Sequence, residues 1–394
     1  MEWEIAKLGD VCNILAGGTP KRSNPSFWNG DIPWVKISDM LQGNITETDE
    51  HITELGLKGS SAKILPQGTV LVSIFATIGR TATLSIPAAT NQAIAGVIPK
   101  SKGVFNPGFL EYCLQNGAIS LKRKARGVAQ VNINSSLLKN LKIPIPPLEE
   151  QTRITRILDT ADALRKQRTN SIEELDALLQ SKSLDLFGDP LTNPKEWDEK
   201  QTLGDTCEIV SGITKGRKTG HQNLREIPYL AVSNVQDQNL NLDVVKTIEA
   251  TETEISRYRI IKDDLLLTEG GDPDKLGRGT LWNNEIAECI HQNHIFRVRI
   301  MNDGIIPEYL IWLIGSRRGK SYFLKSAKQT TGIASINMTQ LKRFPLLIPP
   351  LDIQHEFAKI SHKVKEQKAL IKEQMVELDS LFNSLQKTAF SGDL

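Results

Sequence analysis

Residues 145–151 read Ile-Pro-Pro-Leu-Glu-Glu-Gln, and residues 348–354 read Ile-Pro-Pro-Leu-Asp-Ile-Gln. The two segments lie 203 positions apart, and the composition changes after each one. The next proline after Pro147 is Pro190, and none follows Pro350. Proline is tolerated in the first turn of a helix but breaks its interior. Each Pro-Pro pair therefore predicts the end of a globular domain and the start of a long helix.

The rest of the chain carries the same duplication. Residues 8–14 match residues 203–209 at an offset of 195, and Gly79-Arg80 matches Gly277-Arg278 at an offset of 198. The drift in the offset is what loop insertions produce. A period near 200 is much longer than a solenoid repeat, so the pattern predicts two copies of a whole domain, each followed by its own helix.

We therefore predict a mixed α/β (α+β) protein of four segments. The domains are expected at residues 1–147 and 189–350, and the long helices at residues 148–188 and 351–394. A length of 394 residues fits two domains or more. A helix of about 38 residues is roughly 57 Å long, which is too long for its apolar stripe to be buried within one domain of this size.

Apolar residues recur every seven positions on both predicted helices, which indicates a coiled-coil seam. The predicted pairing residues are Ile154, Ile157, Ala161, Leu164, Leu175 and Leu178 in the first helix and Phe357, Ile360, Val364, Ile371, Leu378, Leu381 and Leu385 in the second. The alternative is that each helix packs on its own domain. Because the first helix must lead into the second domain, we favour antiparallel pairing as a spacer, with the domains at opposite ends.

Shorter patterns indicate the secondary structure within each domain. Strands are predicted at residues 64–73, 81–86, 94–98, 265–268, 289–290 and 295–300, and helices at residues 109–116 and 309–314. The Gly- and Pro-rich residues 17–20 and 29–33 predict long exposed loops.

Composition bounds the class of protein. Hydrophobic residues make up 39% and charged residues 24%, as in ordinary globular proteins. The longest apolar run, residues 70–78, is about half of a membrane span, and the chain starts without a signal-like segment, so we expect a cytoplasmic location. The cysteines form no Cys-x-x-Cys pair, which favours reduced thiols; they are Cys12, Cys113, Cys207 and Cys289.

Charge gives only local hints of a polyanionic partner. The net charge is +2, but residues 122–126, 215–218 and 317–320 are dense basic clusters. The ordinary interpretation of such a cluster is a solvated face.

Catalytic patterns are weak. The Pro-Pro segments lack the polar and aromatic neighbours of an adenine methyltransferase, and residues 270–279 lack the Gly-Lys-Ser/Thr ending of a phosphate loop. Residues 289–294 contain Cys289, His291 and His294, but their short spacing does not favour a metal site, and we expect none. Two alternatives stay open: an enzyme whose site the sequence hides, and a coiled-coil scaffold without DNA affinity.

Four features of the sequence belong together: Trp3 with Leu8-Gly9-Asp10, residues 17–20, residues 28–34, and the repeated Ile-Pro-Pro-Leu-x-x-Gln. With these features, the chain resembles the DNA-specificity subunits of type I restriction-modification systems. The resemblance covers essentially the whole chain. It implies two target-recognition domains held apart by an antiparallel coiled coil, each domain reading one half of a split asymmetric site in double-stranded DNA.

The resemblance also implies partners and no catalysis by this chain. Family members recruit two adenine-N6 methyltransferase subunits and, in the larger complex, restriction endonuclease/translocase subunits. We expect no cofactor here, and S-adenosylmethionine only in the methyltransferase partner.

Candidate DNA-binding residues follow from the resemblance and from the chemistry of base and phosphate recognition by Arg, Lys, Asn and Gln. They are Thr19, Lys21, Arg22, Lys36, Arg80, Arg123, Lys124, Arg126, Gln130, Asn132, Lys215, Arg217, Lys218, Arg278, Thr331 and Asn337. The alternative for the loop residues is exposure without a partner. For Gln130, Asn132 and Asn337 it is hydrogen bonding within their own turns.

Overall fold

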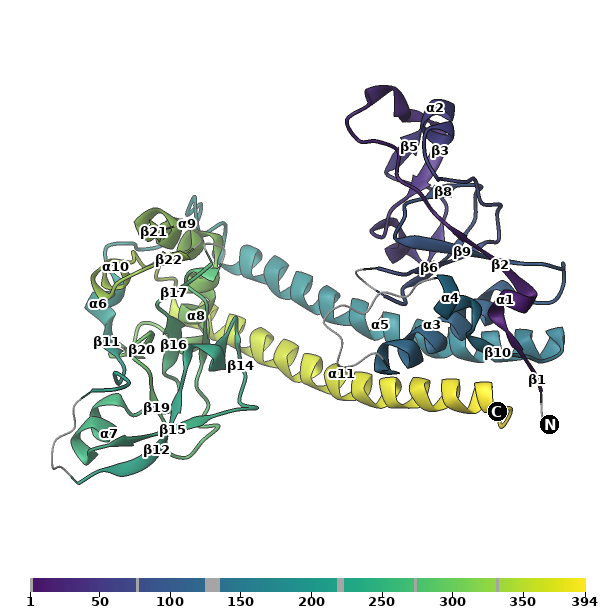
Figure 1. Ribbon diagram of the computed structural model, residues 1–394. Coiled ribbons are helices and arrows are strands. Elements are labelled where there is room, and N and C mark those ends of the chain that lie inside the picture. Colours follow the sequence, from purple (N-terminus) through teal and green to yellow (C-terminus); the bar gives the residue numbers. More distant parts are fainter. Residues whose placement is uncertain (1–2, 76–77, 125–134, 218–222, 273–274, 331–332) are drawn as a thin grey trace. The chain divides into compact units, whose positions relative to one another are not determined.

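The computed structural model describes residues 3–75, 78–124, 135–217, 223–272, 275–330 and 333–394 (Figure 1). The chain divides into two compact units. Unit 1 comprises Met1–Asn170 with Lys372–Leu394, and unit 2 comprises Ser171–Ile371. Each unit thus contains one globular domain together with part of both long helices. Both domains mix helices with sheets, which confirms the predicted α/β class.

Unit 1 is built on a five-stranded sheet and a smaller three-stranded sheet. The larger sheet has the order β2 (Cys12–Ala16), β9 (Ile94–Pro99), β6 (Val70–Ser73), β7 (Thr81–Leu84), β4 (Asn44–Ile45). The smaller sheet has the order β5 (Glu50–Ile52), β3 (Trp28–Val35), β8 (Ala89–Thr90). A further pair is β1 (Glu4–Lys7) with β10 (Lys142–Ile145). The helices are α1 (Leu8–Val11), η1 (Pro25–Phe27), η2 (Asp39–Gln42), α2 (Glu54–Lys58), α3 (Pro107–Lys124) and α4 (Ser135–Lys139).

Unit 2 contains a four-stranded sheet, two three-stranded sheets and a hairpin. The four-stranded sheet has the order β11 (Cys207–Ser211), β20 (Ile295–Ile300), β16 (Leu265–Thr268), β18 (Gly279–Leu281). One three-stranded sheet has the order β15 (Lys246–Ala250), β12 (Arg225–Leu230), β19 (Ile290–His291), and the other has the order β17 (Gly270–Gly271), β22 (Ile333–Ser335), β21 (Lys328–Thr330). The hairpin pairs β13 (Val235–Gln236) with β14 (Asn239–Leu240). The helices are α6 (Leu203–Thr206), η3 (Val232–Asn234), α7 (Glu252–Tyr258), α8 (Pro307–Gly315), α9 (Arg317–Ser326) and α10 (Met338–Lys342).

The duplication predicted from the sequence is present in the topology. The order β2-β9-β6-β7 in unit 1 corresponds to β11-β20-β16-β18 in unit 2, and β5-β3-β8 corresponds to β15-β12-β19. Strand directions correspond as well, because β3 runs parallel to β8 and β12 runs parallel to β19. The two halves are therefore copies of one fold.

The glutamine of the repeated Ile-Pro-Pro-Leu-x-x-Gln segment is buried in both copies and locks each long helix onto its domain. Gln151 Nε2 donates to the carbonyl oxygens of Val104 and Pro146, and its Oε1 accepts from the Asn106 amide at 2.8 Å. Gln354 makes the equivalent three bonds to Gly304, Pro349 and Ile306. Both copies thus use the same buried glutamine with the same three hydrogen bonds, which accounts for the presence of glutamine at this position of both segments.

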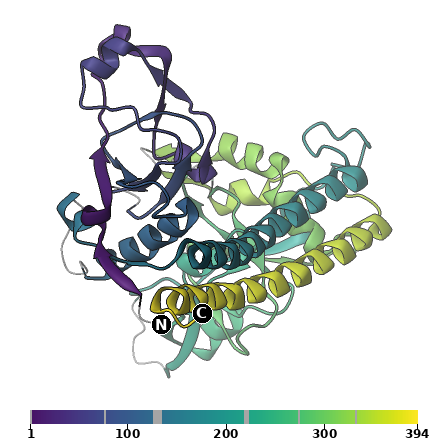
Figure 2. The ribbon, with the colours of Figure 1, turned by 90° about the vertical axis from the view of Figure 1, so that its right-hand side faces the viewer.

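The long helices α5 (Leu148–Phe187) and α11 (Leu351–Ser391) begin directly after the Pro-Pro pairs. Their parts in unit 1 run antiparallel and lie side by side (Figures 1 and 2), with Arg165 Nε 2.6 Å from Asp379 Oδ1. Their parts in unit 2 also run antiparallel, with Lys368 Nζ 2.6 Å from Asp176 Oδ1. The predicted antiparallel pairing is therefore found in each unit.

In each unit, the parts of both long helices also pack on the globular domain of that unit, so helix pairing and packing on a domain occur together. In unit 1, Ile154 of α5 and Phe382 of α11 share one core with Phe109 of α3. In unit 2, Phe187 of α5 and Phe357 of α11 lie 5.2 Å apart between ring centroids, in one core with residues of α8.

The predicted pairing residues fall into two rows, the second of which lies three residues after the first and comprises Ile157, Leu164, Leu178, Ile360 and Leu381. This second row is wrong at three positions. Leu164, Leu178 and Leu381 are 44%, 46% and 50% exposed. Of the other predicted residues, Ile154, Ala161, Phe357, Val364 and Ile371 are buried, and Ile157, Leu175, Ile360, Leu378 and Leu385 are half-buried. The buried second row lies four residues after the first row rather than three, and it comprises Leu158, Ser361, Phe382 and Ala389.

Other local expectations need correction. Residues 29–33, predicted as an exposed loop, lie within β3. Residues 17–20 do form a loop, but most of it is buried, because Gly17 passes so close to the Asn91 carbonyl that an added Cβ would lie 2.1 Å from its oxygen. The strand predicted from residue 64 begins only at Val70, and the strand predicted at residues 289–290 is displaced by one residue. Within the described parts of the chain, no helix combines the length and apolarity that crossing a membrane requires.

Candidate nucleic-acid interface

The first candidate loop is held in shape by its own hydrogen bonds. The Asn24 amide donates to the Lys21 carbonyl at 3.1 Å, which closes a turn, and the Asn24 side chain accepts from the Ser26 amide at the start of η1. Thr19 lies at the base of the loop and donates to the Gln92 side chain. Lys21 and Arg22 lie at the exposed tip of this turn.

Arg22 is fixed by an aromatic ring and a carboxylate. Its guanidinium carbon lies 3.9 Å from the centroid of the Trp28 ring, and Nη1 donates to Glu50 Oε2. Trp28 is held in turn by Trp34, whose ring packs edge-on at 5.1 Å between centroids. The Arg22 side chain is still 54% exposed, so it is oriented by its neighbours but open to solvent.

Lys36 joins the same carboxylate. Its Nζ lies 3.0 Å from Glu50 Oε1 and 3.4 Å from Asp49 Oδ2. The hydrogen bond to Glu50 raises the pKa of Lys36. Partial burial alone would raise the pKa of Glu50, but hydrogen bonds from Arg22 and Lys36 lower it below its usual value. At neutral pH, Glu50 is therefore an ionised carboxylate held between two cations, and Asp49 borders the cluster beside Lys36.

The structure brings Arg22 and Lys36 together through a residue that the sequence analysis missed. Glu50 lies 28 positions after Arg22, and it reaches the cluster because β3 and β5 pair with Trp34 opposite Glu50. No local pattern marks a carboxylate at such a distance along the chain.

The corresponding loop of unit 2 is arranged differently. Lys215 is exposed, whereas Arg217 is only 19% exposed. Arg217 Nε and Nη2 lie 2.5 and 2.8 Å from the two carboxylate oxygens of Glu254. Glu254 also caps α7, because its side chain accepts from the Thr251 amide at 2.9 Å. The hydrogen bonds from Arg217 lower the pKa of Glu254 to about 2. Arg217 therefore fastens its own loop to the start of α7.

The arginine of each repeated Gly-Arg pair lines a cavity. Arg80 Nη1 lies 3.5 Å from the Ile37 carbonyl and borders a cavity of about 680 Å³ in unit 1. Arg278 Nη1 lies 3.3 Å from Gln236 Oε1 and borders a cavity of about 310 Å³ in unit 2. The turns before both arginines have positive φ at Gly79 and Gly277, which favours glycine there.

The remaining candidates divide into three groups. Asn337 caps α10: its side chain accepts from the Gln340 amide at 2.9 Å, which is the local role considered as the alternative. Arg123 and Lys124 form the last turn of α3, and their side chains are not among those described. Five candidates lie outside the described residues, namely Arg126, Gln130, Asn132, Lys218 and Thr331.

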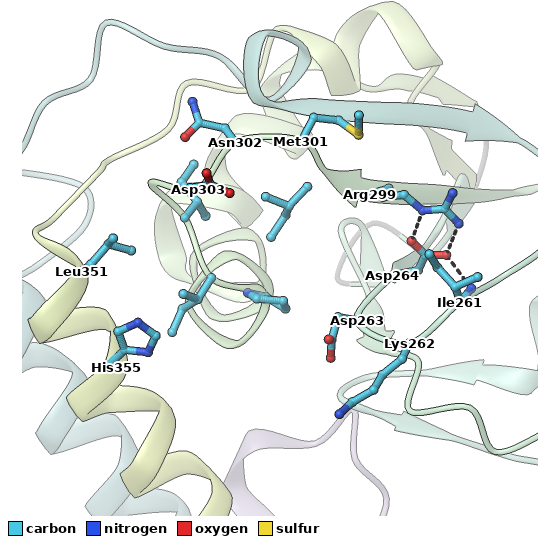
Figure 3. Close-up of a pocket in the computed structure, with 14 residues that line it drawn as sticks. Ile261, Lys262, Asp263, Asp264, Arg299, Met301, Asn302, Asp303, Leu351 and His355 are labelled. Atoms are coloured by element: carbon cyan, nitrogen blue, oxygen red, sulfur yellow. Dashed lines mark hydrogen bonds and ion pairs between the residues drawn. The ribbon is translucent and has the colours of Figure 1, made fainter.

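A second cavity in unit 2, of about 650 Å³, is lined by none of the candidate residues (Figure 3). One wall is the ion pair of Arg299 and Asp264, joined by two hydrogen bonds of 2.8 Å, and Leu351 and His355 of α11 border the opposite side. Asp264 also accepts from the Ile261 amide at 2.8 Å. Its carboxylate is thus already occupied by protein groups, so this cavity has a structural wall rather than a reactive one.

The His-containing segment of unit 2 also serves the fold. His291 is buried, with Nδ1 2.9 Å from the Tyr258 carbonyl and Nε2 3.2 Å from the Val210 carbonyl. Burial lowers the pKa of His291 to about 4. His294 Nδ1 lies 2.6 Å from Glu269. Among the described residues, no three His, Cys, Asp or Glu side chains gather as metal ligands would. The four cysteines are buried free thiols.

Comparison with known proteins gives the family. The model of the type I restriction modification DNA specificity domain matches residues 1–174 and 194–380. The chain belongs to this family. The two matched regions correspond to the two copies of the fold, each with much of the helix that follows it. Most of the chain is therefore specificity domain.

Two relatives and one solved structure illustrate this membership. The type I restriction enzyme MjaIX specificity subunit of Methanocaldococcus jannaschii is 30% identical over 254 residues, covering 59% of this chain and 58% of the relative. The EcoR124I/EcoR124II specificity subunit of Escherichia coli is 32% identical over 181 residues, covering 44% and 43%. The chain thus spans about half the length of these curated relatives.

The solved structure comes from work on complex assembly and conformational transition of the type I R-M system. One of its chains has a TM-score of 0.62 at 18% identity, covering 100% of this chain and 98% of that chain. This likeness extends over both specificity domains and shows that they share its fold.

Proposed function

We propose that this protein is the DNA-specificity subunit of a type I restriction-modification complex. In this proposal each unit reads one half of a bipartite, asymmetric site in double-stranded DNA. The observation that carries it is the duplication: the family model matches both copies of the fold, and the candidate loops of the two copies are held by different partners, Glu50 for Arg22 and Glu254 for Arg217. Two readers of one fold but different loops suit a target with two unlike halves.

The proposed role is recognition and assembly, without catalysis by this chain. The subunit recruits adenine-N6 methyltransferase subunits, which bind S-adenosylmethionine, and restriction endonuclease subunits. This part of the proposal is supported by relatives that are named as specificity subunits of restriction enzymes.

The alternative of a coiled-coil scaffold without DNA affinity has less support. A scaffold would need the paired helices α5 and α11 but not two copies of a specificity domain. Affinity for DNA should show a steep decrease with salt, because each neutralised phosphate releases counterions.

Methylated-base sequencing of DNA from cells that express this chain with its methyltransferase tests the proposal. The expected result is a split, asymmetric N6-methyladenine motif that disappears when this chain is omitted. Exchanging residues 1–145 for those of a relative should change only one half of the motif. If the two proteins associate but produce no motif, or if both halves change together, the proposal is wrong.

A further inference from the structure

The duplication places one arginine at the same position of both candidate loops. Arg22 and Arg217 are 195 positions apart, which is the offset that relates residues 8–14 to residues 203–209. Their surroundings differ. All three nitrogens of the Arg217 guanidinium have acceptors in unit 2, namely the Glu254 carboxylate and the carbonyls of Glu249 and Thr214.

Arg22 has one tether and an aromatic surface instead. Nη1 donates to Glu50, and the guanidinium carbon lies 3.9 Å from the ring centroid of Trp28 and 5.0 Å from that of Trp34. Within the described residues, Nε and Nη2 have no hydrogen-bond partner. The side chain is 54% exposed, against 19% for Arg217. Two donors of a fixed, planar group therefore face solvent at the tip of the turn.

A guanidinium fixed in this way suits recognition of a base better than recognition of a phosphate. Arginine binds guanine through two parallel hydrogen bonds to O6 and N7, which requires a fixed plane and two free donors. The contact with Trp28 and the bond to Glu50 restrict the rotamers of Arg22 in advance, so less freedom is lost on binding. Arginine can also bind a phosphate through two hydrogen bonds, but such a contact carries no sequence information, so only a base contact turns the fixed group into discrimination between base pairs.

Glu50 itself is poorly placed to be a direct contact. Its carboxylate is already engaged by Arg22 and by Lys36 at 3.0 Å, and its negative charge would repel phosphate unless these cations neutralised it. Its geometry is that of a group that holds the two cations in place.

We propose that Arg22 reads a guanine in the half-site bound by unit 1, that Glu50 is the positioning residue for Arg22, and that Arg217 has no reading role. This inference rests on the proposed function. It makes the two specificity domains unequal in a defined way: the same arginine is a reader in one copy and a structural clamp in the other.

The test uses the full chain with its methyltransferase and fluorescent duplexes of the motif found by sequencing. Each base pair of the half-site for unit 1 is replaced in turn, and affinity is measured over a range of salt. For the wild-type protein, replacing one G·C pair should weaken binding roughly 5- to 150-fold, as expected for a bidentate contact. Arg22→Gln should remove this preference, and Glu50→Gln should reduce it at the same base pair.

The matched controls are Arg217→Gln and Glu254→Gln. They remove the equivalent ion pair in unit 2 and should leave the base preference in the half-site for unit 1 unchanged. Because both substitutions release the same loop, any change in the half-site for unit 2 should be the same in the two variants if Arg217 has no reading role. Thermal melting of all four variants separates loss of folding from loss of reading, and Arg22→Lys provides a second variant that keeps the charge but not the planar fork. Arg22→Lys should lose the preference as well.

Two results would overturn the inference while leaving the proposed function intact. If Arg22→Gln weakens every duplex equally and lowers the salt slope by about 0.9, Arg22 is a phosphate contact. If Glu50→Gln keeps the full wild-type preference, Glu50 is not a positioning residue. If the wild-type complex itself shows neither salt-dependent binding nor a motif, the proposed function fails first.

Discussion

Gln354 allows a sharp test of how the long helices are attached. Gln354→Leu keeps about the same volume but removes three hydrogen bonds, and it leaves the Ile306 amide and the carbonyls of Gly304 and Pro349 without their partner. Each unsatisfied buried group costs about 1–3 kcal/mol, and the apolar gain of a buried leucine offsets about 1.5–3 kcal/mol. We expect a net loss of about 3 kcal/mol.

Hydrogen exchange measured by mass spectrometry is the appropriate assay, because the loss is local. Since about 1.4 kcal/mol corresponds to a factor of ten, peptides that contain Ile306 should open about a hundredfold more often in Gln354→Leu. Peptides of unit 1 should keep their protection. Gln151→Leu should have the opposite distribution, because its Oε1 accepts from the Asn106 amide.

The control is Gln367→Leu, which changes an exposed glutamine of the same helix. It should leave exchange at Ile306 unchanged. Unchanged protection of Ile306 in Gln354→Leu, or equal loss in Gln367→Leu, would refute the idea that this glutamine fastens α11 to its domain.

Three further predictions concern the seam and the titrating groups. Ile371→Glu should lower the free energy of unfolding in urea by about 3 kcal/mol, whereas Leu381→Glu at a half-exposed position should change it by less than about 0.5 kcal/mol. The pKa of buried His291 is about 4, below the 6.5 of an unfolded histidine, so stability should fall by about 3 kcal/mol as the pH drops from 6.5 to 4, and His291→Gln should abolish this slope. The pKa of Glu254 is lowered to about 2 by Arg217, so stability should fall again between about pH 4.5 and 2, and Glu254→Gln should flatten that decrease.

The domain plan could be predicted from the sequence because proline interrupts helices and because one offset links distant segments. Both long helices start at the residues that follow the Pro-Pro pairs. The order of the strands could not be predicted. Pairings such as Trp34 opposite Glu50 depend on how the sheet folds over many residues, which no local pattern records.

The error in the helix seam has a physical cause. A heptad alternates steps of three and four, and apolar residues are available at both spacings from the first row, as Ile157 and Leu158 show. The row that lies four residues after the first one includes Arg165 and Lys368. Their aliphatic stems can cover the seam while their charged ends pair with carboxylates of the other helix, Asp379 and Asp176 respectively. Counting only apolar residues hides such a row.

The candidate interface was predicted by residue type but not by arrangement. Arginine and lysine at the tips of loops are easy to find, whereas the groups that decide their availability come from other elements. Glu50 leaves two donors of Arg22 open, and Glu254 occupies Arg217. Exposure of a basic loop therefore could not be judged from the sequence of the loop alone.

The two copies have diverged inside their domains as well as at their surfaces. Gly96 and Arg297 occupy the same position, opposite Leu71 in β6 and opposite Leu266 in β16. At Gly96 an added Cβ would lie 2.5 Å from a methyl group of Leu65, whereas Arg297 is buried and donates to the carbonyls of Arg257 and Arg259 and to Glu208.

A buried arginine that bonds several segments cannot be moved without its acceptors, because an unpaired buried charge is strongly destabilising. Exchange of single strands between the copies should therefore fail. Exchange of a whole domain at the Pro-Pro boundary keeps each buried set together with its own acceptors. The glutamine lock is the same in both copies, so the joint with the long helix is preserved. Under the proposed function, a shared joint with separate interiors would let the two domains change their DNA preference independently.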